Sequence, residues 1–254
     1  MRDIFVTAIV LGALPFALFN PIVGILLWTW LSVMNPHRLS WGFAYNFPFA
    51  QLAAIATLLS LVVAHKKVKF PLTSLTITLI IFFLWINVTM AFAIHQDLSV
   101  EPWSRATKML LMTLVALAIV RHEKQIRIFL WVFVMSVAFF GIKGGIFAIL
   151  TGGEFRVWGP PDSQIGDNNE ISVALVMMIP LMAFLQGVLK RRVAKIAMSI
   201  AILLCALSVV ASYSRGAFVA GCAMVCMMIV KGRRRLVFLV SLAISIAFVL
   251  VFIP

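Results

Sequence analysis

Residues 128–150 read IFLWVFVMSVAFFGIKGGIFAIL, a run of 23 residues in which Lys143 is the only charged side chain. A helix of about 20 apolar residues crosses a hydrocarbon core of about 30 Å. Inside that core a helix also satisfies its own backbone hydrogen-bonding groups, which an irregular segment does not. The run is therefore predicted to be a membrane-spanning helix.

Comparable apolar runs recur along the whole chain. Hydrophobic residues make up 63% of the 254 residues and charged residues 11%, and the mean hydropathy is +1.12. Soluble domains are close to half apolar and about a quarter charged, so this composition excludes a soluble globular protein. The further predicted spans are residues 49–64, 72–94, 106–120, 171–189, 196–211, 217–230 and 236–253.

The first apolar stretch, residues 4–34, is too long for one ordinary span and is interrupted by Asn20-Pro21. It is predicted to form a broken or re-entrant helix pair, with a cleaved signal peptide as the alternative. The fold class that follows is all-α, a polytopic transmembrane helical bundle with about 9–10 membrane segments.

The formal net charge of +13 is distributed in a way that favours a membrane protein and argues against nucleic acid as a partner. Of the 21 Lys and Arg residues, 14 lie in residues 66–69, 121–127, 190–195 and 231–235. Positively charged loops between spans are typically cytoplasmic, and two predicted spans separate each neighbouring pair of clusters. The predicted external segments, which hold six of the eight acidic residues, are 35–48, 95–104, 151–170 and 212–216.

A short turn between two predicted spans carries the first candidate site. Residues 212–216 read Ser-Tyr-Ser-Arg-Gly, so Arg215 is held at the external interface, where its guanidinium suits bidentate binding of a phosphate. Ser212 and Ser214 add hydroxyls, and a helix that begins near Ala217 turns its free N–H groups to the same side. The alternative is that Arg215 snorkels to lipid headgroups.

The longest external loop, residues 151–170, carries the second candidate site. Its combination of an aromatic residue, amides and carboxylates is the composition of a sugar-binding surface. The candidate glycan-binding residues are Arg156, Trp158, Asn168, Asn169 and Glu170. The alternative is a solvated connector in which Asn168 or Asn169 caps the following helix.

The sequence lacks motifs for metal or nucleotide chemistry. Cys222 and Cys226 offer two thiols where a structural zinc site needs four ligands. No glycine-rich nucleotide loop, Walker-type lysine, His-Glu-x-x-His or nucleophile elbow is present, so no metal and no cofactor are predicted. His37 and His95 have no partners at ligand spacing and are expected at the surface, and Lys143 is expected to face a polar cavity or to snorkel.

The turn at residues 212–218, Ser-Tyr-Ser-Arg-Gly-Ala-Phe, resembles the Ser-Arg-Gly motif that opens the shared domain of the O-antigen ligase and polysaccharide polymerase superfamily. Residues 35–42, Asn-Pro-His-Arg-Leu-Ser-Trp-Gly, and residues 156–160, Arg-Val-Trp-Gly-Pro, are similar to the O-glycosylation ligases associated with the exosortase A system. The resemblance runs through most of the chain.

The resemblance implies a metal-independent enzyme of the bacterial inner membrane. Such an enzyme moves a glycan from a polyprenyl-diphosphate carrier to a hydroxyl of a protein, lipid or glycan acceptor at the external, periplasmic face. In that superfamily the arginine of the Ser-Arg-Gly turn holds the carrier diphosphate, a role that carries over onto Arg215, with Ser212 and Ser214 beside it.

The resemblance also implies how the chain is organised. Residues 1–190 correspond to an N-terminal transmembrane region that includes the external loop 151–170, and residues 191–254 to the start of an O-antigen ligase-like domain. The superfamily has a further large external loop with a histidine that acts on the acceptor, and no such loop occurs before Pro254. The sequence is therefore expected to be partial, and no catalytic residue is assigned.

Other functions are also compatible with these residues. A polysaccharide polymerase belongs to the same superfamily. A transporter or flippase for a lipid-linked or anionic solute predicts charged residues deep in several spans and inverted repeats, and among the predicted spans Lys143 alone fits that pattern. A structural or assembly subunit, with its external loops as plain connectors, is the third class.

Overall fold

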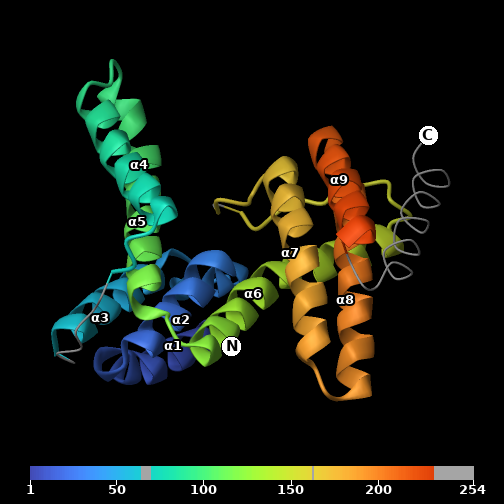
Figure 1. Cartoon of the computed structure of the whole chain (residues 1–254), viewed down its shortest axis with the longest axis horizontal. Coiled ribbons are helices and arrows are strands. Elements are labelled where there is room, and N and C mark those ends of the chain that lie inside the picture. The colour runs from blue at the N-terminus through green and yellow to red at the C-terminus, as the bar shows by residue number, and fades with distance from the viewer. Residues whose placement is uncertain (64–69, 162, 232–254) are drawn as a thin grey trace. The chain divides into compact units, whose positions relative to one another are not determined.

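The computed structural model describes residues 1–63, 70–161 and 163–231, which form nine α-helices, two short 3-10 helices and no strand (Figure 1). The predicted all-α fold is confirmed. The helices are α1 Arg2–Phe19, α2 Pro21–Val33, η1 Pro36–Leu39, η2 Phe43–Asn46, α3 Phe49–Val63, α4 Ser74–Ala91, α5 Gln96–Ile119, α6 Glu123–Leu150, α7 Asn168–Val188, α8 Arg192–Ala211 and α9 Arg215–Lys231.

Five of the described helices are long and apolar enough to cross a membrane, namely α1, α4, α6, α7 and α8. The shorter helices α2, α3 and α9 are also apolar. The protein is thus a multi-pass membrane protein. The predicted span 236–253, the basic cluster 66–69, Asp162 and the part of the last basic cluster beyond Lys231 lie outside the described residues.

The chain divides into two compact units. Unit 1 comprises Met1–Leu31 and Ser40–Phe129, and unit 2 comprises Ser32–Leu39 and the chain from Leu130 onward. The domain boundary predicted at residue 190 concerns family relationship and stays a prediction. In the structure, α7 and α8 pack against each other across that position within unit 2.

In unit 1 the first apolar stretch breaks where it is predicted to break. Asn20 has an extended backbone between α1 and α2, and its Oδ1 accepts a hydrogen bond from Ile22 N at 3.3 Å. Pro21 opens α2 because the first residue of a helix needs no backbone N–H. At the other end of α1, Asp3 Oδ1 accepts from Gly42 N at 3.0 Å, so the N-terminus lies beside the segment that leads into α3.

The helices α4 and α5 of unit 1 pack against each other as a hairpin (Figure 1). The predicted external segment 95–104 and the predicted span from residue 106 belong largely to one helix, because α5 begins at Gln96. Its first turns are polar but compatible with a helix, and Arg105 pairs with Glu101 one turn away. Polarity marks where an apolar span ends, which is not where the helix ends.

In unit 2 a cluster of glycines lets α6 approach α7 and α8 closely. A Cβ at Gly145 would lie 2.2 Å from Leu204 O, and one at Gly141 would lie 2.5 Å from Leu175 Cδ2. Small residues at helix contacts are typical of membrane bundles. The core around them includes the fully buried Ile171, Met182 and Cys205.

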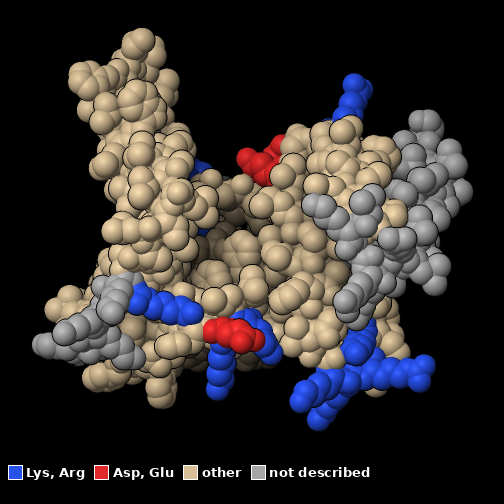
Figure 2. Space-filling model, in the orientation of Figure 1, with Lys and Arg blue, Asp and Glu red and all other residues tan. Residues whose placement is uncertain are grey.

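The two ends of unit 2 differ in charge. Lys190, Arg191 and Arg192 lie in and beside the turn between α7 and α8, and Figure 2 shows basic side chains gathered there. The α6–α7 loop and the α8–α9 turn form the opposite end, where Figure 2 shows acidic side chains near the start of α7. Both candidate sites therefore lie at the end of unit 2 away from this basic cluster.

Candidate functional site

The turn between α8 and α9 consists of Ser212, Tyr213 and Ser214. Tyr213 has a φ of 56°, the left-handed conformation that redirects the chain after α8. The Ser214 hydroxyl accepts a hydrogen bond from Ala217 N at 3.2 Å and so caps the start of α9. This short turn places Arg215 at the first position of α9.

The two predicted serines of this turn are buried, whereas Arg215 is exposed. Ser212 is 1% exposed and Ser214 is 5% exposed. Ser212 Oγ donates to Val209 O at 2.7 Å and accepts from Ser214 N at 3.3 Å. No described carboxylate forms an ion pair with Arg215, and a Cβ at Gly216 would meet no heavy atom within 4 Å. The hydroxyls shape the turn, and the guanidinium and the helix start face open space.

The loop between α6 and α7 is anchored at Val157. This side chain is buried against Ala211 at the end of α8, and its backbone N donates to Ala211 O at 3.0 Å. A Cβ at Gly144 would lie 2.6 Å from Val157 Cγ1, so the glycine in α6 makes room for the anchor. Arg156 and Trp158, on either side of Val157, are exposed, and Trp158 is 59% exposed.

The second half of the loop closes on itself before α7 begins. Gly159 N donates to Gly166 O at 3.0 Å. A Cβ at Gly159 would lie 1.6 Å from Ile165 O, a distance that admits no other residue without moving the backbone. The described residues between Trp158 and α7 therefore form a folded turn and not an open connector.

Asp167 and Glu170 cap the start of α7. The Asp167 carboxylate accepts from Asn169 Nδ2 at 3.0 Å, and Glu170 Oε2 accepts from Asp167 N at 3.1 Å. The expectation that Asn168 or Asn169 caps this helix is wrong, because Asp167 occupies the N-cap position. Hydrogen bonds from Asn169, foremost, and the charge of Arg156 lower the pKa of Asp167.

Asn168 faces inward from the same first turn of α7. It is 7% exposed, and its Nδ2 donates to Ser212 O at 2.8 Å. At the other end of the loop, the Tyr213 hydroxyl donates to Gly153 O. With the bond from Val157 to α8, three hydrogen bonds join the loop and α7 to the end of α8 and its turn. The two candidate sites, found separately in the sequence, are thus parts of one surface.

In the sequence, the exposed residues of this surface and Asn168 are candidates, whereas Val157 and Tyr213, which also hold the surface together, are not. Val157 lies between Arg156 and Trp158, and an apolar residue there is a weak sign that the middle of the loop is buried. The sequence does not indicate the role of Tyr213. Its partner is a backbone carbonyl, which every residue type offers. The exposed members are Arg156, Trp158, Asn169, Glu170 and Arg215, and their ligands stay predictions.

His37 and Lys143 are distant from this surface in the sequence. They differ in exposure to solvent. His37 is 8% exposed, so the expectation of a surface histidine is wrong for this residue. Burial, helped by the charge of Arg38, lowers the pKa of His37 to about 4. Lys143 is exposed on α6.

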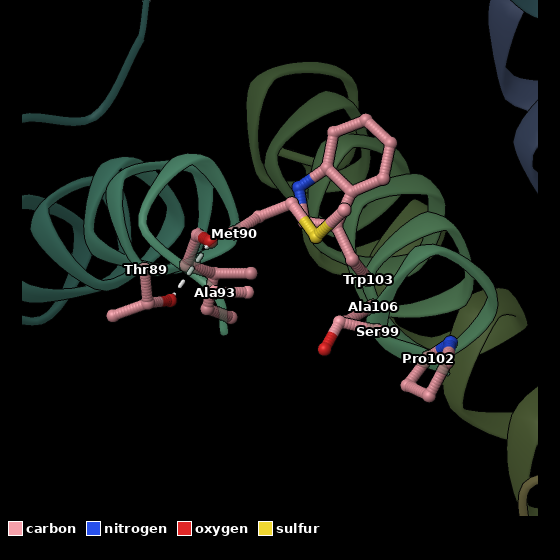
Figure 3. Close-up of a pocket in the computed structure, with 8 residues that line it drawn as sticks. Thr89, Met90, Ala93, Ser99, Pro102, Trp103 and Ala106 are labelled. Atoms are coloured by element: carbon pink, nitrogen blue, oxygen red, sulfur yellow. Dashed lines mark hydrogen bonds between the residues drawn. The ribbon is translucent and has the colours of Figure 1, made fainter. Parts of the chain in front are cut away.

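A cavity of about 360 Å³ lies between α4 and α5 in unit 1 (Figure 3). Its lining residues are Ile86, Thr89, Met90, Ala93, Ser99, Pro102, Trp103 and Ala106. The hydroxyls of Thr89 and Ser99 already donate to backbone carbonyls of their own helices, and Trp103 Nε1 donates to Asn87 Oδ1 at 3.2 Å. No charged side chain lines this cavity, so it offers nothing to hold a phosphate.

Comparison with known proteins gives a family but no described activity. No curated protein and no solved structure matched the chain. The family match ends at residue 190, between α7 and α8, and so includes the α6–α7 loop but not the Arg215 turn. Residues 1–190 match DUF5935, a family of unknown function, and since this is about three quarters of the 254 residues, the protein belongs to the DUF5935 family.

Proposed function

We propose that the protein takes part in the transfer of a glycan from a polyprenyl-diphosphate carrier to an acceptor hydroxyl at the external, periplasmic face of the bacterial inner membrane. The observation that supports this function best is the exposed Arg215 at the first position of α9. It directly follows the turn of Ser212, Tyr213 and Ser214, which is bonded to the loop of Arg156 and Trp158.

The chemistry of the turn suits a diphosphate. A guanidinium offers paired N–H donors to phosphate oxygens, and the start of a helix carries partial positive charge on its free N–H groups. Gly216 adds no side chain that would keep a ligand from these groups. In glycan transfer the carrier diphosphate leaves with increasing negative charge, so a fixed cation beside it lowers the barrier.

The neighbouring loop supplies groups of a different kind. Trp158 presents an exposed aromatic face, and Asn169 and Glu170 present an amide and a carboxylate on the first turn of α7. These groups suit the hydroxyls and apolar faces of a sugar. A donor site at Arg215 and a glycan site at the loop would then lie side by side, as a transfer reaction requires.

Replacing Arg215 tests this function. Cells that carry Arg215→Ala are expected to lose glycosylated acceptor and to accumulate carrier-linked glycan, and Arg215→Lys is expected to restore part of the activity because it keeps the charge but not the paired donors. The measurement is the amount of each glycan species, separated by gel and mass spectrometry. Arg192→Ala is the matched control, since it removes an exposed arginine at the opposite end of unit 2.

Unchanged acceptor glycosylation in Arg215→Ala would remove this residue from the reaction. Movement of lipid-linked glycan across proteoliposomes, without formation of a glycosidic bond, would instead favour a flippase. A polymerase of the same superfamily would show elongation of the carrier-linked glycan itself.

A further inference from the structure

The end of α8 shows why the loop and the Arg215 turn are fixed to each other. The last carbonyl groups of a helix have no intrahelical partner and must find one elsewhere when they are buried. Val209 O accepts from the Ser212 hydroxyl, and Val210 O accepts from Tyr213 N. The next two carbonyls, of Ala211 and Ser212, are left for groups from outside α8.

The loop and α7 supply both missing donors. Val157 N donates to Ala211 O at 3.0 Å, and Asn168 Nδ2 donates to Ser212 O at 2.8 Å. Since Asn168 and Ser212 are both buried, losing this amide would leave a carbonyl without a partner in a place that water reaches poorly.

Tyr213 makes the reciprocal connection. Its residue belongs to the turn, and its hydroxyl donates to Gly153 O at the start of the loop. Gly152 and Gly153 have φ values of 61° and 80°, so the chain leaves α6 in a left-handed conformation that presents this carbonyl to the turn. One bond thus runs from α7 to Ser212 and another from Tyr213 to the loop, so two consecutive residues shortly before Arg215 are fixed.

We infer that Asn168 and Tyr213 are positioning residues, which hold the Arg215 turn against the α6–α7 loop and so set the affinity of Arg215 for a diphosphate without contacting it. This inference rests on the proposed function, since it concerns the same site. Asn168 then acts through the backbone of Ser212, three residues before Arg215, and its amide is directed away from the exposed surface that a glycan would reach.

The test measures how much the diphosphate group contributes to binding. The full chain, in detergent or in lipid nanodiscs, is titrated with farnesyl diphosphate and separately with farnesol. The Kd for farnesol divided by the Kd for farnesyl diphosphate then gives the contribution of the diphosphate group. Asn168→Ala and Tyr213→Phe are each expected to lower this ratio by roughly five- to tenfold, the effect of about one lost hydrogen bond. General damage to the fold would weaken the binding of both ligands and leave the ratio unchanged.

The chain offers a matched control for each variant. Gln164→Ala removes an exposed amide elsewhere in the α6–α7 loop. Tyr45→Phe removes the hydroxyl of the other of the two tyrosines. Both controls are expected to keep the ratio of the parent protein, and a loss in the controls as large as in the variants would overturn the positioning role.

Arg215→Ala separates this inference from the proposed function. If Arg215→Ala leaves the ratio unchanged, the diphosphate site itself is refuted, and the positioning role falls with it. If Arg215→Ala lowers the ratio but Asn168→Ala and Tyr213→Phe do not, only the positioning role is refuted. Should Asn168→Ala not fold, Tyr213→Phe still decides, because it removes one hydroxyl and leaves the ring in place.

Discussion

His37 is buried, and burial lowers its pKa to about 4 from an ordinary value of about 6.5. Between these two values the unfolded chain binds a proton that the folded protein does not, so unfolding becomes more favourable as the pH falls from about 6.5 toward 4. We expect the melting temperature to decrease over this interval, and to decrease less in His37→Gln. Thermal unfolding in detergent at pH 7 and pH 5 measures the difference.

His95→Gln is the control for this prediction, since His95 is exposed. An equal decrease in the parent protein and in His37→Gln would assign the acid sensitivity to other groups. The residue also shows the limit of reasoning from single positions. A histidine in a polar, proline-containing segment is typical of a surface, and only the packing of the Ser32–Leu39 segment in unit 2 buries it.

At the scale of elements, the contact between α6 and α8 leaves no room for a side chain at Gly145. A Cβ at Gly145 would lie 2.2 Å from Leu204 O, and a backbone atom in a helix cannot move aside as a flexible side chain can. Gly145→Ala is therefore expected to destabilise the protein by about 1–3 kcal/mol, the usual range for overpacking. The melting temperature of purified protein measures this effect.

Gly187→Ala provides the comparison, because a Cβ there would meet nothing within 4 Å. In the last turn of α7 this change is expected to be neutral or to stabilise by about 0.5–1 kcal/mol, since alanine loses less backbone freedom on folding than glycine. Equal destabilisation by the two substitutions would contradict the close contact at Gly145. The sequence shows both glycines alike, and only the neighbouring helix distinguishes them.

At the scale of the whole molecule, the two ends of unit 2 are expected to face opposite sides of the membrane. Gln164 lies in the α6–α7 loop and Arg191 in the α7–α8 turn, and both are exposed. Labelling of each variant is compared with labelling of the parent protein. Gln164→Cys is expected to react with a membrane-impermeant maleimide in intact cells. Arg191→Cys is expected to react only after the membrane is permeabilised.

Labelling of residue 191 and not of residue 164 in intact cells would reverse the orientation of unit 2. Arg215 would then lie on the cytoplasmic side, and a periplasmic transfer reaction at this residue would be ruled out. The orientation follows from the excess of lysine and arginine in cytoplasmic loops, whereas the geometry of unit 2 requires only that the two positions lie at opposite ends.

The all-helical membrane fold, the break at Asn20 and the short turn before Arg215 were determined by the sequence alone, because apolar length, a proline and turn-forming residues act locally. The start of α5 and the N-cap at Asp167 depend on local contacts that several polar residues could make, whereas the burial of Asn168 was decided by the tertiary structure. Each depends on which of several chemically suitable residues reaches a particular partner. For Asn168 that partner is a carbonyl 44 residues away at the end of α8, which becomes a partner only when α7 and α8 pack together.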